Sequence, residues 1–422
     1  MKKILLIGFL ALTASILFAA GNQDSANDAK EEVITLTLWD IMVNAEEERA
    51  IKPAVEQWNA DNPNVQIVRD SLDDESYKIK LKTAIAANET PDLFFSWGGG
   101  FSKPFVDAGK VLPLDDYISQ DLLDRTIEGV LDYATYDDTL YGLAYSQWVG
   151  VLYCNQEMFD QYNVKIPETY SELLNAIEVF KNNGVDPIGV GASERWTSMF
   201  YHNVLALRTA GADKVNRALE GNENFTDGDF QEAAEKLSEL VEAGAFNNGF
   251  MGMNFDEFKA LFLAGRIPMI YQGDWVAGEC ELEDSLVKGK IIATHFPAIE
   301  GSAASPKDFL GGALDTFMVS ANTKHKEEAV KALEFLCEYQ STAGFEAGMG
   351  LPVFKGELDF SKTNPLTAQI VGLAKEATGF TLAWDTFFTG QDTELHLDLV
   401  QELFAGMISP VEFSAQMQTI NE

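Results

Sequence analysis

The first part of the chain alternates between short apolar runs and amphipathic segments. The apolar runs have the β-branched composition of strands, and the first amphipathic segment places Ile51, Val55 and Trp58 on one helical face. In order, the expected elements are strand 33–39, helix 45–59, strand 65–68, helix 77–88 and strand 93–96. This order predicts an α/β fold with a parallel sheet and helical crossovers. Pro53 predicts a kink in the first helix or a later start to it.

The remaining chain predicts a second lobe. Its 422 residues exceed what one hydrophobic core usually serves. Segments 141–153 and 312–320 have the character of strands that pass from one lobe to the other and back. The other expected elements are helices 169–183, 196–210, 229–243, 255–265 and 326–339, and strands 187–191, 268–271 and 291–296. We expect an N-terminal lobe of 33–143 plus 314–343 and a C-terminal lobe of 144–313 plus 344–422.

The N-terminus predicts export. Residues 1–21 have two lysines, an uncharged apolar stretch and small residues near Gly21, as a cleaved signal peptide has. Residues 22–32 are polar and acidic, which is typical of a flexible lead-in. The signal contains no cysteine that would carry a lipid anchor. The mature protein is therefore expected in the periplasm or outside the cell.

The charge and the cysteine content of the chain limit which partners and cofactors we expect it to bind. The formal net charge of −36 repels nucleic acid and anionic membranes. The chain has three cysteines, of which Cys337 is expected to be buried and Cys154 and Cys280 are expected to stay unpaired, although a bridge between them is the alternative. The four histidines lack metal-ligand spacing, and no phosphate loop or nucleophile elbow occurs. We therefore expect no cofactor, no metal, no catalytic residue and no nucleic-acid partner.

Three of the seven tryptophans adjoin an aspartate in the sequence, namely Trp39-Asp40, Asp274-Trp275 and Trp384-Asp385. An indole stacks on the C–H face of a pyranose, and a carboxylate accepts hydrogen bonds from its hydroxyls. For any single tryptophan, burial in a core is the more common outcome, and Trp58 is expected to be such a case. The repeated aspartate neighbour favours a carbohydrate ligand.

Short motifs along the chain occur in a characteristic order. They are Trp39-Asp40, 91–98, 109–114, 141–144 with 152–155, 167–173, 262–269, Gly273-Asp274-Trp275, and Gly311-Gly312 before 318–320. Their collinear order resembles the extracellular solute-binding proteins (family 1) of sugar-type ABC transporters, a group that includes maltose- and multiple-sugar-binding proteins. The resemblance covers 33–422. It implies two α/β lobes that close by a hinge around one sugar in a cleft.

The resemblance and the residue chemistry together predict a set of ligand-binding residues. They are Asp40, Asn44, Trp97, Gly99, Trp148, Glu194, Trp196, Tyr201, Asp274, Trp275, Gly312, Asp315, Trp384 and Asp385. Structural alternatives exist for several of them. Asp40 has the position of a helix N-cap, Gly98 to Gly100 suit a tight turn, and Glu194 suits an acidic helix start.

The expected function is to bind a mono- or oligosaccharide outside the cytoplasm and deliver it to an ABC transporter permease, as a monomer. The alternative is a secreted glycoside hydrolase or lyase, because two carboxylates and clustered aromatic residues also suit that chemistry. A chemosensory or adhesion role for the same fold is a third hypothesis, since fold alone does not determine function.

Overall fold

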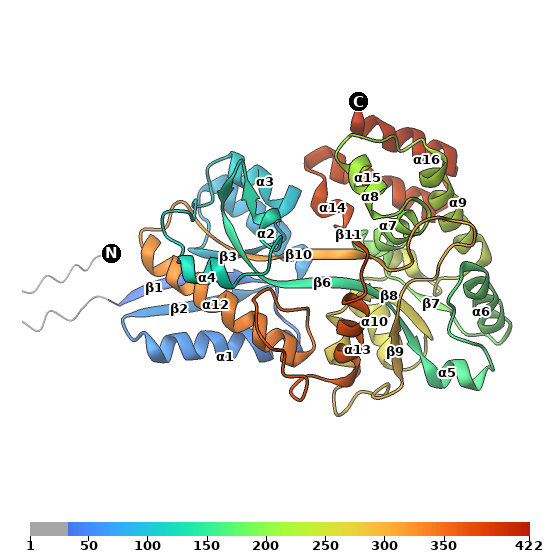
Figure 1. Ribbon diagram of the computed structural model, residues 1–422, viewed down its shortest axis with the longest axis horizontal. Coiled ribbons are helices and arrows are strands. Elements are labelled where there is room, and N and C mark those ends of the chain that lie inside the picture. The colour runs from blue at the N-terminus through green and yellow to red at the C-terminus, as the bar shows by residue number, and fades with distance from the viewer. Residues whose placement is uncertain (1–32) are drawn as a thin grey trace, which may run out of the picture.

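Two long antiparallel strands, β6 (Gly142–Asn155) and β10 (Asp308–Val319), link the two halves of the molecule (Figure 1). The computed structural model describes residues 33–422, apart from the side chains of 45–47 and 313–314. Shorter strands of both halves extend one sheet in the order β2-β1-β3-β10-β6-β8-β7, while β9 pairs with β6 and β11 with β10. The predicted α/β fold with two lobes and crossing strands is confirmed.

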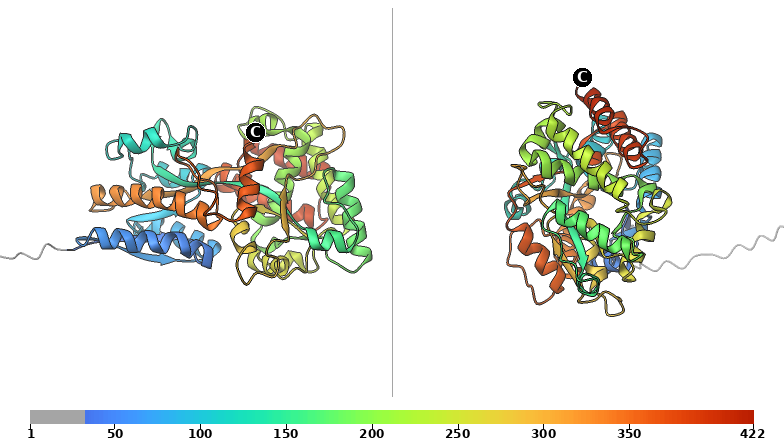
Figure 2. Two further views of the ribbon diagram at one scale, coloured as in Figure 1. Left: turned by 60° about the horizontal axis from the view of Figure 1, so that its bottom comes forward. Right: turned by 90° about the vertical axis from the view of Figure 1, so that its right-hand side faces the viewer.

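The first lobe is built on the parallel strands at the start of the chain. β1 lies between β2 and β3 and is parallel to both, and β10 is antiparallel to β3. Helices α1 and α12 lie side by side in Figures 1 and 2, and the rings of Trp58 and Phe335 meet between them at 5.5 Å. The elements are β1 (Ile34–Asp40), α1 (Ala45–Asp61), β2 (Val65–Ser71), α2 (Asp74–Ala87), β3 (Leu93–Ser96), α3 (Gly99–Asp107), α4 (Gln120–Arg125), β4 (Thr135–Tyr136), β5 (Thr139–Leu140) and α12 (Lys326–Ala347).

The second lobe surrounds a helix that is buried on all sides. From Thr197 to Thr209, α7 has only buried residues, as expected of a helix inside a core. β8 and β9 are antiparallel to β6, and β7 is parallel to β8. The elements are α5 (Gln156–Gln161), α6 (Tyr170–Asn182), β7 (Ile188–Gly189), α7 (Trp196–Ala210), α8 (Ala212–Leu219), α9 (Gly228–Ala243), α10 (Phe255–Leu263), β8 (Met269–Gly273), α11 (Val276–Cys280), β9 (Ile291–Thr294), α13 (Pro365–Ala374), β11 (Gly379–Thr381), α14 (Trp384–Phe387), α15 (Gly390–Phe404) and α16 (Pro410–Met417).

Local sequence signals explain where several helices begin. The Asp73 side chain accepts a hydrogen bond from the backbone N–H of Ser76 at the start of α2. Reciprocal capping boxes begin α6 at Thr169, α10 at Asn254 and α16 at Ser409. Each cap satisfies backbone donors that the helix itself leaves unpaired and contributes ~1 kcal/mol.

The lobes have separate hydrophobic cores. Leu38, Phe94 and Leu333 are fully buried in the first lobe, and Phe180 and Leu237 are fully buried in the second. Each such side chain stabilises its lobe by ~1.5–3 kcal/mol relative to exposure. Because the cores are distinct, the lobes are joined by the crossing strands and by surface contacts rather than by a shared interior.

One of those surface contacts joins α3 of the first lobe to α14 of the second. A β carbon at Gly100 would lie 2.3 Å from the carbonyl oxygens of both Phe387 and Phe388. Phe105 anchors α3 in the first core, whereas Trp384 anchors α14 in the second. The closeness of the lobes here therefore depends on a residue that has no side chain.

Some expectations are corrected or stay open. Helix α1 passes through Pro53 without a break, with Ile51, Ala54 and Trp58 buried on its inner face, so packing offsets the lost hydrogen bond. The lobe boundaries stay a prediction. The signal peptide (1–21) and the lead-in (22–32) lie outside the described residues.

The three cysteines are free and buried, as expected for Cys337 and for an unpaired Cys154 and Cys280. Within residues 33–422, no helix combines the length and apolar character that crossing a bilayer requires.

Candidate ligand-binding cleft

A cleft of about 550 Å³ lies between the lobes, and both lobes line it. The first lobe contributes residues that follow β1 and residues from α2 and α3. The second contributes the start of α7, the end of β8 and parts of α14 and α15. The crossing strands add Tyr145 and Trp148 from β6 and Asp315 from β10. The carboxyl ends of the sheet strands therefore meet at one hollow, where α/β folds commonly bind ligands.

Four rings of the second lobe form what we call the aromatic wall: Trp148, Trp196, Phe200 and Trp275. Trp148 stacks on Phe200 with centroids 5.3 Å apart and meets Trp275 edge-on at 5.2 Å. Trp196 and Phe200 are one helical turn apart on α7, and their rings lie at 5.2 Å. Half-buried Trp196 and Trp275 leave part of each indole free for a ligand.

A glycine permits the position of Trp275. The indole folds back over the end of β8, and a β carbon at Gly273 would lie 2.1 Å from a ring atom. Any side chain at Gly273 would therefore displace the indole from the wall.

The first lobe contributes aromatic and cationic side chains to the same cleft. Trp97 and Phe101 meet edge-on at 4.9 Å at the start of α3. Lys78 and Lys82 of α2 hold their ammonium groups 5.1 Å from the Trp97 ring and 5.5 Å from the Phe101 ring. These distances are typical of cation–π contacts, which orient the two rings.

Polar atoms in the cleft lack partners among the described residues. Asp274 is 2% exposed; its Oδ1 accepts a hydrogen bond from the backbone N–H of Val149 at 3.4 Å, and its buried Oδ2 has no hydrogen-bond partner there. Oδ1 of Asp385 and Nε1 of Trp196 are also buried and have no hydrogen-bond partner among the described residues. Unsatisfied buried polar atoms are costly, so a ligand that bonds to them gains affinity.

Burial also changes the acidity of the cleft carboxyl groups. It raises the pKa of Asp274 well above its ordinary value. Burial, together with the negative charge of Asp74, raises the pKa of Asp315 to about 7, and burial raises the pKa of Asp385 to about 6. Near neutral pH, Asp274 and a fraction of Asp315 therefore carry a proton and can both donate and accept hydrogen bonds, whereas Asp385 mainly accepts them.

Most of the predicted ligand-binding residues line this cleft. They are Asn44, Trp97, Trp148, Glu194, Trp196, Asp274, Trp275, Asp315 and Asp385. These residues come from elements far apart in the sequence, and the fold brings them to one hollow.

The other predicted residues lie elsewhere. Asp40 is fully buried in an ion pair with Arg69, whose Nε lies 2.6 Å from Oδ2. Tyr201 is in the second core, where its hydroxyl donates to the Gly189 carbonyl at 3.0 Å. Trp384 is fully buried and stacks on His396 at 5.0 Å.

Neither predicted glycine lines the cleft. The carbonyl of Gly99 accepts a hydrogen bond from the Tyr136 hydroxyl at 2.7 Å. Gly312 pairs with Trp148 beside an irregularity in β10, and a β carbon there would lie 2.8 Å from Leu382. Both glycines serve backbone geometry.

Sequence analysis missed several residues of the cleft, among them Lys78, Tyr145, Phe200, Phe255 and Thr386. Phe200 was detectable, because it lies four residues after Trp196 on the same helix. Lys78 and Thr386 have no local signal, since surface lysines and threonines are common on any helix.

Among residues 33–422, no group of three or more His, Cys, Asp or Glu side chains is arranged to hold a metal ion.

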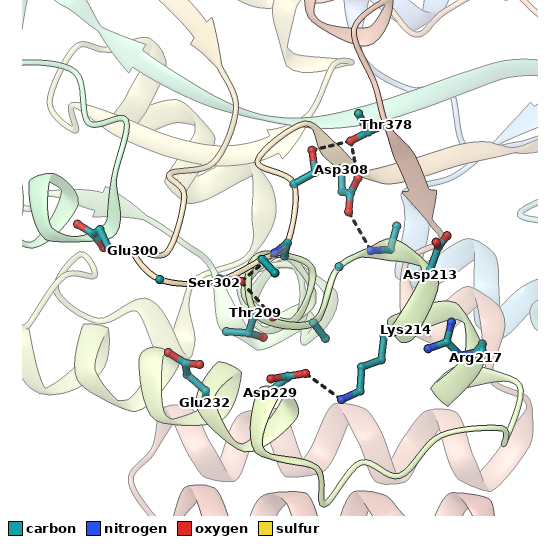
Figure 3. A pocket seen from close by; sticks show the side chains of 17 residues that line it. Thr209, Asp213, Lys214, Arg217, Asp229, Glu232, Glu300, Ser302, Asp308 and Thr378 are labelled. Carbon is teal, nitrogen blue, oxygen red and sulfur yellow. Dashed lines mark hydrogen bonds and ion pairs between the residues drawn. The ribbon is translucent and has the colours of Figure 1, made fainter.

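A second cavity, of about 790 Å³, lies on the second lobe and shares no lining residue with the cleft (Figure 3). Its buried carboxylate, Asp308, already accepts hydrogen bonds from the backbone N–H of Ala212 at 2.9 Å and from the Thr378 hydroxyl at 2.7 Å. Lys214 is paired with Asp229 at 2.8 Å. No aromatic side chain is among the described residues that line it. It therefore lacks the stacking surface that the cleft has.

Together, these features define a two-lobe binding protein with an interlobe ligand cleft, and comparison with known proteins identifies its family. The family described as bacterial extracellular solute-binding protein matches residues 44–341. The chain belongs to this family.

Individual relatives agree in fold. A solved structure from a study of xylan utilization by the thermophilic bacterium Caldanaerobius polysaccharolyticus is 44% identical, with a TM-score of 0.89 over 92% of this chain and 100% of that chain. A structure of a chitin oligosaccharide binding protein is 24% identical, with a TM-score of 0.83 over 92% of this chain and 98% of that one. The multiple sugar-binding protein of Streptococcus mutans is 22% identical over 86% of this chain and 85% of its own length. None of these similarities supports the hydrolase or lyase alternative.

Proposed function

We propose that this protein binds an oligosaccharide outside the cytoplasm and delivers it to the permease of an ABC transporter. The observation that supports this most directly is the pairing of Asp274 with Trp275. A buried carboxyl oxygen that has no hydrogen-bond partner among the described residues adjoins a half-exposed indole that lines the same cleft. This pair serves the two surfaces of a sugar, its C–H face and its hydroxyl rim.

The ligand class that we propose is a neutral xylo-oligosaccharide. The 44% identical structure comes from work on xylan utilization. The cleft lining also favours a neutral ligand over a uronic acid, because its carboxyl groups outnumber its cationic side chains, which are Lys78, Lys82, Arg195 and Lys259. An additional negative charge in this cleft would be repelled.

Binding is proposed to stabilise the closed arrangement of the lobes. A ligand that contacts Trp97 of the first lobe and Trp275 of the second has its full set of contacts only when the lobes meet. The permease then recognises the closed form. We place the exported protein in the periplasm or outside the cell and expect it to act as a monomer.

A ligand panel tests this proposal. Thermal shift followed by isothermal titration calorimetry should detect xylobiose and xylotriose, because a ligand that binds only the native state raises its melting temperature. Chito-oligosaccharides, maltotriose and glucuronic acid serve as comparison ligands. The proposal is refuted if the protein binds none of the sugars in this panel. Chromatographic detection of shortened xylotriose after incubation would instead show an enzyme.

A further inference from the structure

Arg195 has a backbone conformation that residues with a side chain rarely adopt. Its φ is 61° and its ψ is −44°, at the junction between a short 3-10 turn and helix α7. The β carbon of an L-residue is crowded at positive φ, so this conformation persists only where surrounding contacts enforce it. Both neighbours of Arg195, Glu194 and Trp196, line the ligand cleft.

Helix α15 supplies contacts that enforce the conformation. Nη2 of Arg195 lies 2.8 Å from Oε2 of Glu394, and Nη1 lies 2.9 Å from Oδ1 of Asp398. Nε2 of Gln401 donates to the hydroxyl of Ser198 at 2.7 Å. Glu394, Asp398 and Gln401 are spaced by four and three residues, so they lie on one face of α15. We call these three residues the α15 clamp.

The backbone around Arg195 is held as well. Its carbonyl accepts hydrogen bonds from the Ser198 hydroxyl at 2.7 Å and from the Met199 N–H at 3.0 Å. Its own N–H donates to the carbonyl of Ala192 at 3.1 Å. Hydrogen bonds therefore fix the backbone on both sides of Arg195.

The backbone conformation of Arg195 sets the positions of two cleft residues, Glu194 and Trp196. Oε2 of Glu194 accepts the backbone N–H of Phe255 at 2.9 Å, which ties the junction to the start of α10. The Trp196 ring lies 5.2 Å from Phe255 and 6.3 Å from Trp275, as part of the aromatic wall. An extended or helical Arg195 would direct at least one of these side chains out of the cleft.

We propose that Arg195 is a positioning residue for ligand binding: the α15 clamp holds it at a positive φ so that Glu194 and Trp196 face the cleft together. The acids of the clamp have side chains that are 55% and 65% exposed, and such ion pairs add little to global stability. The main effect of these ion pairs is on the local backbone conformation at Arg195. The link to affinity rests on the proposed function, whereas the geometry of Trp196 does not.

The test compares Arg195→Gly, Arg195→Ala and the control Arg217→Ala. Arg217 also pairs with an acid, Glu223 at 2.9 Å, but it does not line the cleft. Three quantities are measured: the urea midpoint, acrylamide quenching of Trp196, and the Kd for xylotriose. The Trp196 signal is obtained by subtracting the fluorescence of the same protein with the additional substitution Trp196→Phe.

We expect the glycine variant to have a higher urea midpoint than the alanine variant, because glycine has no β carbon to be crowded at positive φ, whereas alanine keeps that β carbon. Both should show greater quenching of Trp196 and a Kd raised roughly three- to tenfold, as expected for a weakened stacking contact. Arg217→Ala should change none of the three quantities.

Unchanged Trp196 quenching in both Arg195 variants would overturn the proposal, as would a midpoint for Arg195→Gly as low as that of Arg195→Ala. If wild-type protein binds no xylotriose, the proposed ligand is wrong, and the quenching and urea data still decide the role of Arg195.

Discussion

Replacing Gly100 by alanine is expected to weaken ligand binding without unfolding either lobe. The added β carbon would lie 2.3 Å from the carbonyl oxygens of Phe387, at the end of α14, and of Phe388, which follows it, whereas ordinary contacts begin at 3.4 Å. Backbone oxygens at a helix end cannot rotate away as a flexible side chain can. The lobes must therefore separate by about 1 Å at this contact to restore van der Waals distances.

The expected magnitude follows from the energy of such overpacking, which is ~1–3 kcal/mol. Because α3 and α14 belong to different cores, partial opening of the lobes relieves the clash, so the energy falls on the closed form alone. A closed form destabilised by this amount raises the ligand Kd by about 5- to 150-fold.

Calorimetry with xylotriose measures the Kd, and urea unfolding of the ligand-free protein measures stability. Small-angle scattering at saturating ligand reports whether the lobes still close. The matched control is Gly372→Ala in α13, because a β carbon at Gly372 meets no atom within 4 Å. A Gly100→Ala protein with wild-type affinity, or one with a lower urea midpoint than the wild-type protein, would refute this reasoning.

Three other predictions concern the cleft and the first lobe. Trp275→Ala should weaken sugar binding by ~1–3 kcal/mol through lost stacking, and an unchanged Kd in calorimetry would exclude this residue from the site. The pKa of Asp315 is about 7 in the folded protein and has an ordinary value of 3.8, so the folded form holds this proton more tightly and its contribution to stability is lost as pH rises from about 4 through 7. Asp315→Asn should therefore raise the melting temperature at pH 8 and leave it unchanged near pH 4; a difference that is the same at both pH values would contradict this cause. Arg69→Met should destabilise the protein by ~3–5 kcal/mol in urea unfolding, since it leaves the carboxylate of Asp40 buried without its partner. Addition of Asp40→Asn should recover part of that loss, and a double variant no more stable than Arg69→Met would argue against an unpaired charge as the cause.

The raised pKa values of three carboxyl groups in the cleft have one physical origin, which is burial. Asp274, Asp315 and Asp385 are removed from water before any ligand arrives, and burial raises the pKa of each, so each keeps its proton to a higher pH than an exposed carboxyl group does. A neutral carboxyl group can donate to one sugar hydroxyl and accept from another. A cleft with many acids is thus compatible with an uncharged ligand.

Local sequence patterns were sufficient to locate most elements of the fold. Helix α7 spans the predicted residues 196–210, and the extended segment at 141–153 forms most of the crossing strand β6. These two elements are buried on nearly all sides, so they were recognised by the length and apolar content of the segment and by its flanking residues rather than by a one-sided period. The same reasoning placed Trp275 at the end of an apolar strand, where it is found.

Only the tertiary structure decided which polar and aromatic side chains face the cleft. Asp40 and Asp274 both follow strands beside a tryptophan, yet Arg69 neutralises Asp40 inside the first lobe while Asp274 keeps a carboxyl oxygen unpartnered at the cleft. Trp384 stacks on His396 in the core, while the next residue, Asp385, lines the cleft. Arg69 and His396 lie outside the local motifs of Asp40 and Trp384, and Asp274 Oδ2 has no partner among residues 33–422, so local sequence patterns could not predict these outcomes.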